Sequence, residues 1–207
     1  MKKITLAVIT VLSFGFANAQ GVKFGAKAAL NVASLTGDVD NVSSLVGFQI
    51  GAFAEFKLSD KFAFQPELMY STQGAKESAN EYIEGYNVDV DMKSKLGYLN
   101  VPLMLKYYAA PKFSLEFGPQ IGFLLSAKAD VDFLMNVNGM DVPGSTTVDV
   151  KDQANSVDFG LNFGLGYDIT EKFNAGVRYN LGLSNIYDDS DASAKNSVFS
   201  VSAAYKF

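Results

Sequence analysis

The chain has 207 residues, of which 48% are hydrophobic and 13% aromatic, and its formal net charge is −5. It contains no His and no Cys, which excludes Ser-His-Asp and Cys-His nucleophiles, His- or Cys-based zinc sites and a disulfide framework. The acidic balance argues against nucleic acid as a partner. Composition therefore predicts a non-enzymatic protein without a cofactor or a metal.

The first 19 residues have the pattern of a secretory signal peptide. A basic start at residues 1–3 precedes an apolar run over 4–16, and residues 17–19 read Ala-Asn-Ala, an Ala-x-Ala cleavage site. The run is shorter than the roughly 20 residues of a transmembrane helix, which disfavours the alternative of an uncleaved anchor. We therefore expect export, with cleavage between Ala19 and Gln20.

After the signal peptide, hydrophobic residues recur at every second position in eight segments. These segments are 22–32, 46–56, 62–70, 99–107, 113–125, 157–169, 173–183 and 199–207. A period of two is that of a β-strand with one apolar and one polar face. In the last segment the apolar face ends on an aromatic residue, Phe207. The pattern predicts eight β-strands in a single domain over residues 20–207.

The apolar register of these segments carries no charged residue. The other register holds eleven: Lys23, Lys27, Glu55, Lys57, Glu67, Lys106, Glu116, Asp158, Asp168, Arg178 and Lys206. A charge facing lipid at mid-membrane costs about 2–4 kcal/mol, so this exclusion favours an apolar face in lipid. The soluble alternative, a lipocalin-like barrel with the apolar face inward, is disfavoured because eight strands enclose too little space for so many large side chains.

The polar register is then expected to line the lumen of a transmembrane β-barrel. Its five acids and six bases are nearly balanced, and isolated buried charges are prohibitively costly. We therefore predict a network of paired ions that fills the lumen. Open channels occur in barrels of about 16–18 strands, so no sizeable conductance is expected.

Short and long connections alternate strictly along the chain. The short ones are 58–61, 108–112 and 170–172, and the long ones are roughly 36–45, 74–97, 126–156 and 185–196. Outer-membrane barrels have short periplasmic turns and longer extracellular loops. With an even number of strands in an up-and-down antiparallel order, both termini are expected in the periplasm.

Aromatic residues flank the short turns. They are Phe56, Phe62, Tyr107, Phe113, Tyr167, Phe173 and Phe207. Aromatic residues are enriched where a barrel crosses the membrane–water interface. The regular placement predicts an interfacial girdle, although the chain has no Trp.

Two of the long loops contain strand-like pieces. Segments 131–137 and 140–150 flank Asn138-Gly139, the signal of a type I′ hairpin, and Glu84-Gly85 precedes a second alternating piece. We predict that strands three to six continue beyond the membrane as a protruding sheet. The alternative is that these segments are irregular loops, since isolated hairpins are marginal in water.

Fifteen of the 22 acidic residues lie in the long loops. They include Glu77, Glu81, Glu84, Asp130, Asp132, Asp188, Asp189 and Asp191. Clustered carboxylates bind calcium, and Asp188 to Asp191 is the best candidate, but its spacing does not match an EF-hand loop. A solvated acidic surface is the default expectation.

Four segments resemble the PorT-type outer-membrane β-barrel family of Bacteroidota. They are 21–27 (GVKFGAK), 98–107 (YLNVPLMLKY), 117–125 (FGPQIGFLL) and 178–185 (RYNLGLSN). The resemblance covers essentially the whole mature chain and implies an eight-stranded barrel of the OmpA/OmpX type. It also accommodates Pro66, Pro102 and Pro119, which we expect at bulges or locally unpaired positions because proline cannot donate to a strand ladder.

The end of the chain resembles the terminal aromatic signal that outer-membrane assembly machinery reads. Tyr205 and Phe207 carry this pattern. The expected partners are therefore outer-membrane lipid and the barrel assembly machinery. No functional-residue motif of the family transfers to this chain.

Three functions remain open at this point. The first is a monomeric outer-membrane barrel with a plugged lumen, whose acidic loops and protruding sheet make surface contacts. The second is an accessory component of protein secretion, as the name-giving type IX member of the PorT-type family implies. The third is a small porin or ligand-binding barrel.

Overall fold

The computed structural model describes residues 22–38, 42–83, 86–137, 140–187 and 193–207. Several predictions fall outside these ranges: the cleavage site at Ala19 and Gln20, the turns at Glu84-Gly85 and Asn138-Gly139, and the calcium candidate Asp188 to Asp191. Among the described residues, no helix is long and apolar enough to cross a membrane.

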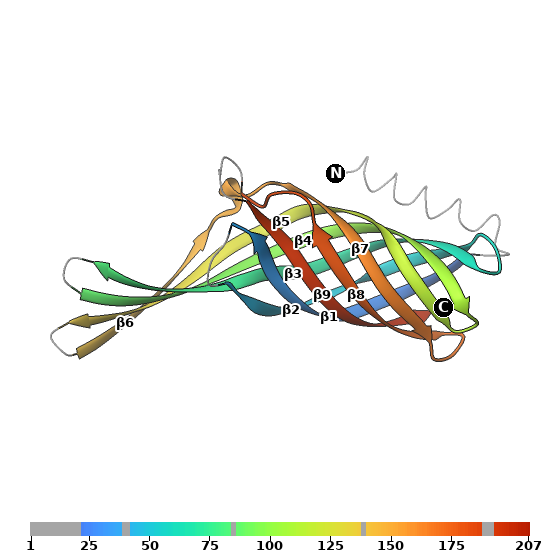
Figure 1. Ribbon diagram of the computed structural model, residues 1–207, viewed down its shortest axis with the longest axis horizontal. Helices are drawn as coiled ribbons and strands as arrows, with labels where there is room; N and C mark the ends of the chain where they lie inside the picture. The colour runs from blue at the N-terminus through green and yellow to red at the C-terminus, as the bar shows by residue number, and fades with distance from the viewer. Residues whose placement is uncertain (1–21, 39–41, 84–85, 138–139, 188–192) are drawn as a thin grey trace.

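Antiparallel strands account for most of the described chain (Figure 1). They are β1 (Val22–Gly37), β2 (Val42–Lys57), β3 (Phe62–Ile83), β4 (Tyr86–Ala110), β5 (Phe113–Val137), β6 (Met140–Asp149), β7 (Val157–Asp168), β8 (Phe173–Gly182) and β9 (Ala194–Lys206), with a 3-10 helix, η2, at Lys151–Gln153. Within the described ranges these are the nine strands of one sheet.

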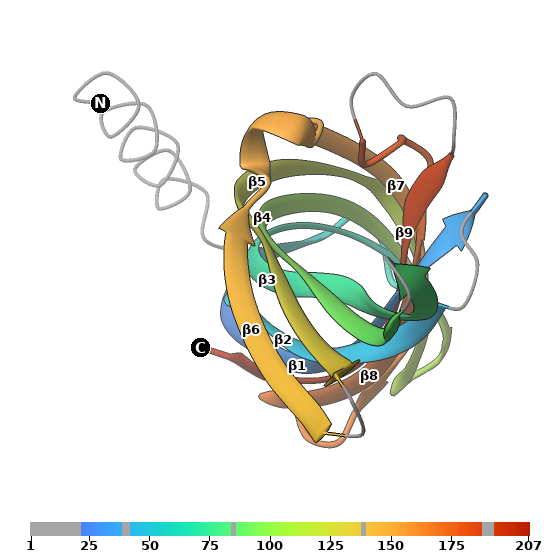
Figure 2. The same cartoon turned by 90° about the vertical axis from the view of Figure 1, so that its left-hand side faces the viewer.

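Eight of the strands close a ring, seen from one end in Figure 2. Each strand pairs with its neighbours along the chain, β5 pairs with β7, and β1 pairs with β9 to close the ring, with Ala28 opposite Ala203. Each of the eight predicted segments coincides with one of these strands, and 157–169, 173–183 and 199–207 run one residue past the strand end. The predicted all-β, up-and-down arrangement of eight strands is therefore confirmed.

The third, fourth and fifth strands continue well past the ring, as Figure 1 shows at its left-hand side. The lower part of β5 pairs with β7 over Phe113–Phe123, and its upper part pairs with β6 over Lys128–Val137. The protruding sheet therefore consists of β3, β4, β5 and β6.

The prediction that the sixth strand also extends is wrong. The return arm of the hairpin is a separate strand, β6, and η2 divides it from β7. The chain has to cross back from the protruding sheet to the ring at this point, and an isolated bridge between Ala154 and Tyr187 ties the crossing segment down. A single continuous strand cannot pair with β5 in both places, because Phe123 lies opposite Val157 and Lys128 opposite Asp149, so the longer segment 150–156 runs beside the shorter segment 124–127.

The wall of the ring is apolar outside and polar inside, the reverse of a soluble domain. Val46 is 72% exposed and Leu30 66%, whereas Lys106 is 1% and Asn31 0% exposed. The outward face of β4 changes character along its length: Val101 and Leu99 lie in the ring, and Lys95 and Asp91 follow in the protruding sheet. The apolar belt thus ends where the protruding sheet begins.

The three prolines within the ring have an opposite residue on one side only. Pro66 lies opposite Leu103, Pro102 opposite Gln120, and Pro119 opposite Leu161. The register of each proline with its other neighbouring strand is interrupted at that position. This agrees with the expected locally unpaired positions, because a proline has no N–H for a second ladder.

Candidate functional site

The centre of the lumen is a charge cluster built around Arg178 of β8. Its guanidinium donates to both oxygens of Glu67, at 2.8 Å to Oε2 and 2.9 Å to Oε1. The same group donates to Oε2 of Glu116 at 2.8 Å. Glu67 also accepts from Lys27 at 3.3 Å and from the amide of Gln65 at 2.7 Å. The bidentate geometry fixes the position of Glu67 inside the barrel.

Lys106 of β4 links this cluster to a second one nearer the turns. Its Nζ lies 3.5 Å from Oε1 of Glu116 and 3.0 Å from Oε2 of Glu55. Glu55 then contacts Lys206 at 3.3 Å, and Lys206 contacts Asp168 at 3.2 Å. The ion pairs therefore run without a break from the middle of the lumen to its turn end.

Each of the eight strands in the ring supplies one member of this lumen network. The members are Lys27, Glu55, Glu67, Lys106, Glu116, Asp168, Arg178 and Lys206. Four bases face four acids, so the lumen network has no formal net charge. Such an arrangement ties all eight strands together across the barrel, which neighbouring backbone ladders alone do not do.

Three of the predicted lumen charges lie outside the lumen network. Lys23 and Lys57 are exposed at the turn end, where they line the open mouth of the lumen and Lys57 pairs with Asp60 at 3.0 Å. Asp158 is 4% exposed and lies at the opposite end of β7 from Asp168. It has no ion pair among the described residues.

Two further layers of the lumen were not predicted. Above the lumen network lies a belt of buried amides, in which Asn180 donates to Asn162 at 3.2 Å and Asn162 to Gln120 at 3.3 Å. Above that belt, buried apolar side chains close the far end: Leu35, Ala75, Leu96, Tyr98, Leu124, Ala127, Ala154 and Ile186. The recurrence of Asn and Gln in the polar register was a usable signal for the belt. The apolar layer includes loop residues that fold back into the lumen, and a hydrophobic periodicity does not predict such a return.

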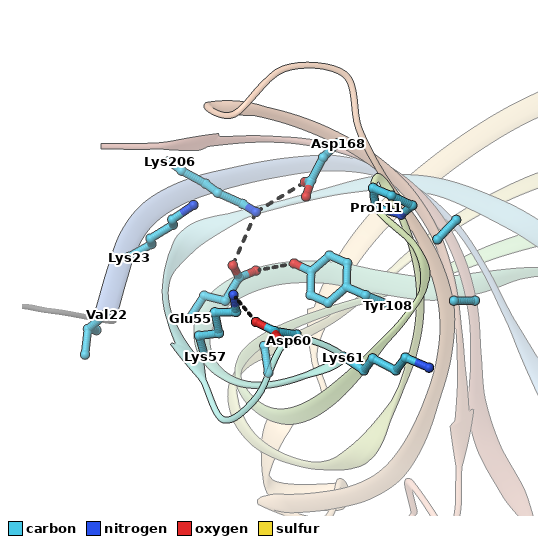
Figure 3. Close-up of a pocket in the computed structure, with 13 residues that line it drawn as sticks. Val22, Lys23, Glu55, Lys57, Asp60, Lys61, Tyr108, Pro111, Asp168 and Lys206 are labelled. Carbon is cyan, nitrogen blue, oxygen red and sulfur yellow. Dashed lines mark hydrogen bonds and ion pairs between the residues drawn. The ribbon is translucent and has the colours of Figure 1, made fainter.

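At the turn end the lumen opens into a vestibule, drawn in Figure 3. This cavity of ≈ 1040 Å³ is lined by turn residues such as Lys61 and Pro111 and ends on the Lys206–Glu55 pair. Tyr108 donates to Glu55 at 3.2 Å beside that pair (Figure 3). Farther in, the amide belt encloses a cavity of ≈ 10 Å³. That volume is about the room that one water molecule needs.

The lumen charges are neutralised by each other, and the space between them is filled by side chains. Within the described ranges, no three carboxylates lie close enough to hold a metal ion.

A model of the family described as "Outer membrane protein beta-barrel domain" matches residues 16–188. The chain belongs to this family of outer-membrane barrels. Membership agrees with the apolar belt and supports an outer-membrane location. This match does not show membership of the PorT-type family in particular. No curated relative matches the chain.

Several solved outer-membrane barrels are similar to this chain at low identity. The attachment invasion locus protein Ail of Yersinia pestis is 15% identical, with 91% of this chain and 100% of that chain covered and a TM-score of 0.46. Neisserial surface protein A is 16% identical, with the same coverage and TM-score. CarO2 of Acinetobacter baumannii is 12% identical, with 91% and 100% covered and a TM-score of 0.44. The family match, and not these likenesses, identifies the chain.

Proposed function

We propose that this protein is a monomeric, non-enzymatic barrel that spans the outer membrane, is closed to solutes, and presents its protruding sheet to molecules at the cell surface. The observation that carries the proposal is the lumen network, in which each strand of the ring supplies one charge and no net charge remains. A selective pore requires uncompensated charge or open space along its axis. The lumen network supplies neither.

The proposed orientation places the turns and both termini in the periplasm and the protruding sheet outside. Its support is the aromatic girdle at the turn end, where the Tyr205 ring lies 5.0 Å from Phe173 and 5.8 Å from Phe207. In this account residues 1–19 are removed between Ala19 and Gln20. The assembly machinery then reads Tyr205 and Phe207, and the barrel domain over 20–207 inserts into lipid.

The protruding sheet supplies the surface for contacts in this proposal. Its outward face carries complementary charges on neighbouring strands, with Lys93 3.0 Å from Asp132 and Lys95 2.6 Å from Asp130. These paired charges keep the sheet soluble beyond the membrane. The fifteen acidic residues of the long loops make the surroundings of the sheet negative.

The role of a secretion accessory is the second candidate, and it rests on the four segments that resemble the PorT-type family. A deletion strain separates the two candidates. Loss of type IX cargo from the medium would favour the secretion role, and an unchanged secretome would leave the surface role. A small porin is disfavoured by the ≈ 10 Å³ cavity within the amide belt.

Membrane fractionation followed by gel electrophoresis tests the shared premise. We expect the protein in the outer-membrane fraction, migrating faster without boiling than after boiling, because a closed barrel resists unfolding by detergent. Recovery in the soluble periplasm, or identical migration with and without boiling, would contradict it.

A further inference from the structure

Lysine recurs beside the aromatic residues of the turn end. Five exposed lysines are each next in sequence to a phenylalanine at a strand end: Lys23 and Phe24, Lys57 and Phe56, Lys61 and Phe62, Lys112 and Phe113, Lys172 and Phe173. We call these five lysines the lysine rim. The sixth such pair, Lys206 and Phe207, differs because Lys206 turns into the lumen network.

The lysine rim has spare positive charge. Among the described residues, Lys57 alone of the five forms an ion pair, with Asp60. Among the described residues, the exposed acidic side chains of the turns are Asp60 and Glu171. Five lysines against two acidic side chains leave a surplus of three positive charges outside the lumen network.

The aromatic girdle indicates at what depth of the proposed membrane the lysine rim lies. Lys172 Nζ lies 3.5 Å from the hydroxyl of Tyr205 and 5.7 Å from the centre of its ring. Phe173 and Tyr205 stack edge to face at 5.0 Å just inside it. Interfacial aromatics lie at the level of lipid head groups, and lysines there extend their ammonium groups toward the phosphates.

We propose that the lysine rim binds the phosphate groups of anionic phospholipids in the membrane leaflet that the turns face. This inference rests on the proposed function, since it requires that the ring spans a bilayer. Each lysine near an anionic membrane surface contributes roughly fivefold to binding. Lys23, Lys57 and Lys61 also line the vestibule, whereas Lys112 and Lys172 are not among its lining residues, so the last two are expected to contribute most to the binding of head groups.

The opposite end of the barrel has the opposite charge balance. The long connections contain fifteen acidic residues against six lysines. A barrel with this asymmetry favours anionic lipid at the turn end and disfavours it at the other. The charge difference therefore selects one leaflet, and it opposes inverted insertion.

Native mass spectrometry of the full mature protein with phosphatidylglycerol or phosphatidylcholine tests the proposal. The rim variant combines Lys23→Gln, Lys61→Gln, Lys112→Gln and Lys172→Gln. The matched control combines Lys76→Gln, Lys128→Gln, Lys151→Gln and Lys195→Gln, which removes the same charge from the other end. All three proteins are first checked for heat-modifiable migration in pure phosphatidylcholine vesicles.

The wild type and the control variant are expected to retain phosphatidylglycerol in preference to phosphatidylcholine. The rim variant is expected to lose that preference, with a drop of at least about tenfold in the affinity for phosphatidylglycerol. Equal retention by the rim variant and the wild type would overturn the proposal, and so would an equal loss in the control. Displacement of the lipid by millimolar inorganic phosphate would also overturn it, because the lysine rim would then be a general anion site. Absence of heat-modifiable migration in every protein would instead reject the proposed function.

Discussion

Arg178 is the residue on which the lumen network depends most, because it bonds two carboxylates from different strands. It contacts Glu67 through both of its terminal nitrogens and Glu116 through one of them. Arg178→Met would leave both carboxylates short of their nearest cation in a buried setting. We expect a loss of about 3–5 kcal/mol in the free energy of unfolding, measured by urea titration of the refolded protein.

Lys23→Gln is the control for this experiment. Lys23 is exposed and lies outside the lumen network, so its replacement is expected to change the free energy of unfolding by about 0.5 kcal/mol or less. Similar small losses in both variants would mean that the lumen network does not stabilise the barrel.

The charged pairs of the protruding sheet predict that the stability of this sheet depends on pH. The hydrogen bond from Lys95 holds the pKa of Asp130 below its usual value, and the hydrogen bond to Asp132 raises the pKa of Lys93. The Asp130 contribution is present above about pH 4 and is lost as the pH falls through its lowered pKa. The Lys93 contribution is present below about pH 10 and is lost as the pH rises through its raised pKa.

Hydrogen-exchange protection factors of the amides at 128–133 report this dependence. We expect these protection factors to be highest between about pH 4 and about pH 10 and to decrease toward acid. The decrease is expected to be smaller in the Lys95→Gln variant. Salt should weaken the effect because these pairs are exposed to solvent. An identical acid profile in Lys95→Gln would show that the Asp130 pair is not its cause.

Which residues face the lumen could be predicted from the sequence, but not which of them touch. Lys106 and Glu55 are 51 positions apart, and their 3.0 Å contact depends on how far each strand is shifted against the next around the ring. The periodicity of a single strand carries no information about the shift between neighbouring strands. For the same reason Lys23 and Lys57 were expected in the lumen network, although they line the vestibule instead.

At the scale of the element, Gly74 marks where β3 passes from the ring to the protruding sheet. Its φ is +137°, and a Cβ there would overlap the carbonyl oxygen of Ser94 on the neighbouring strand. Gly74→Ala therefore combines backbone strain with a clash against a rigid atom. We expect a loss of about 1–3 kcal/mol, seen as a lower urea midpoint.

Gly176→Ala is the matched variant. Gly176 does not have a positive φ, and its added Cβ would lie 3.0 Å from the carbonyl oxygen of Leu165 and 3.2 Å from the hydroxyl of Ser202. These contacts need only small adjustments, so we expect a smaller shift. Equal midpoints for the two variants would contradict the role assigned to Gly74.

The strands of the ring were predictable because every second residue faces outward and is apolar, as a lipid-facing strand requires. The protruding sheet was harder to predict, because its two faces meet water and no such requirement applies. Alternation identified the 131–137 and 140–150 hairpin, but the division between β6 and β7 follows from the change of partner along β5. A change of partner leaves no periodic signal in the sequence.

At the scale of the whole molecule, three layers close the barrel: the lumen network, the amide belt and the apolar cluster around Tyr98 and Ile186. The vestibule is open at the turn end and stops at Lys206 and Glu55. In the proposed function the barrel is therefore closed and acts through its surfaces.

Single-channel recording in planar bilayers tests this claim most directly, using protein whose insertion is verified by heat-modifiable migration. We expect no stable conductance steps for the wild type, because the ion pairs and amides fill the lumen. Frequent, stable steps of large conductance from the inserted wild-type protein would contradict it.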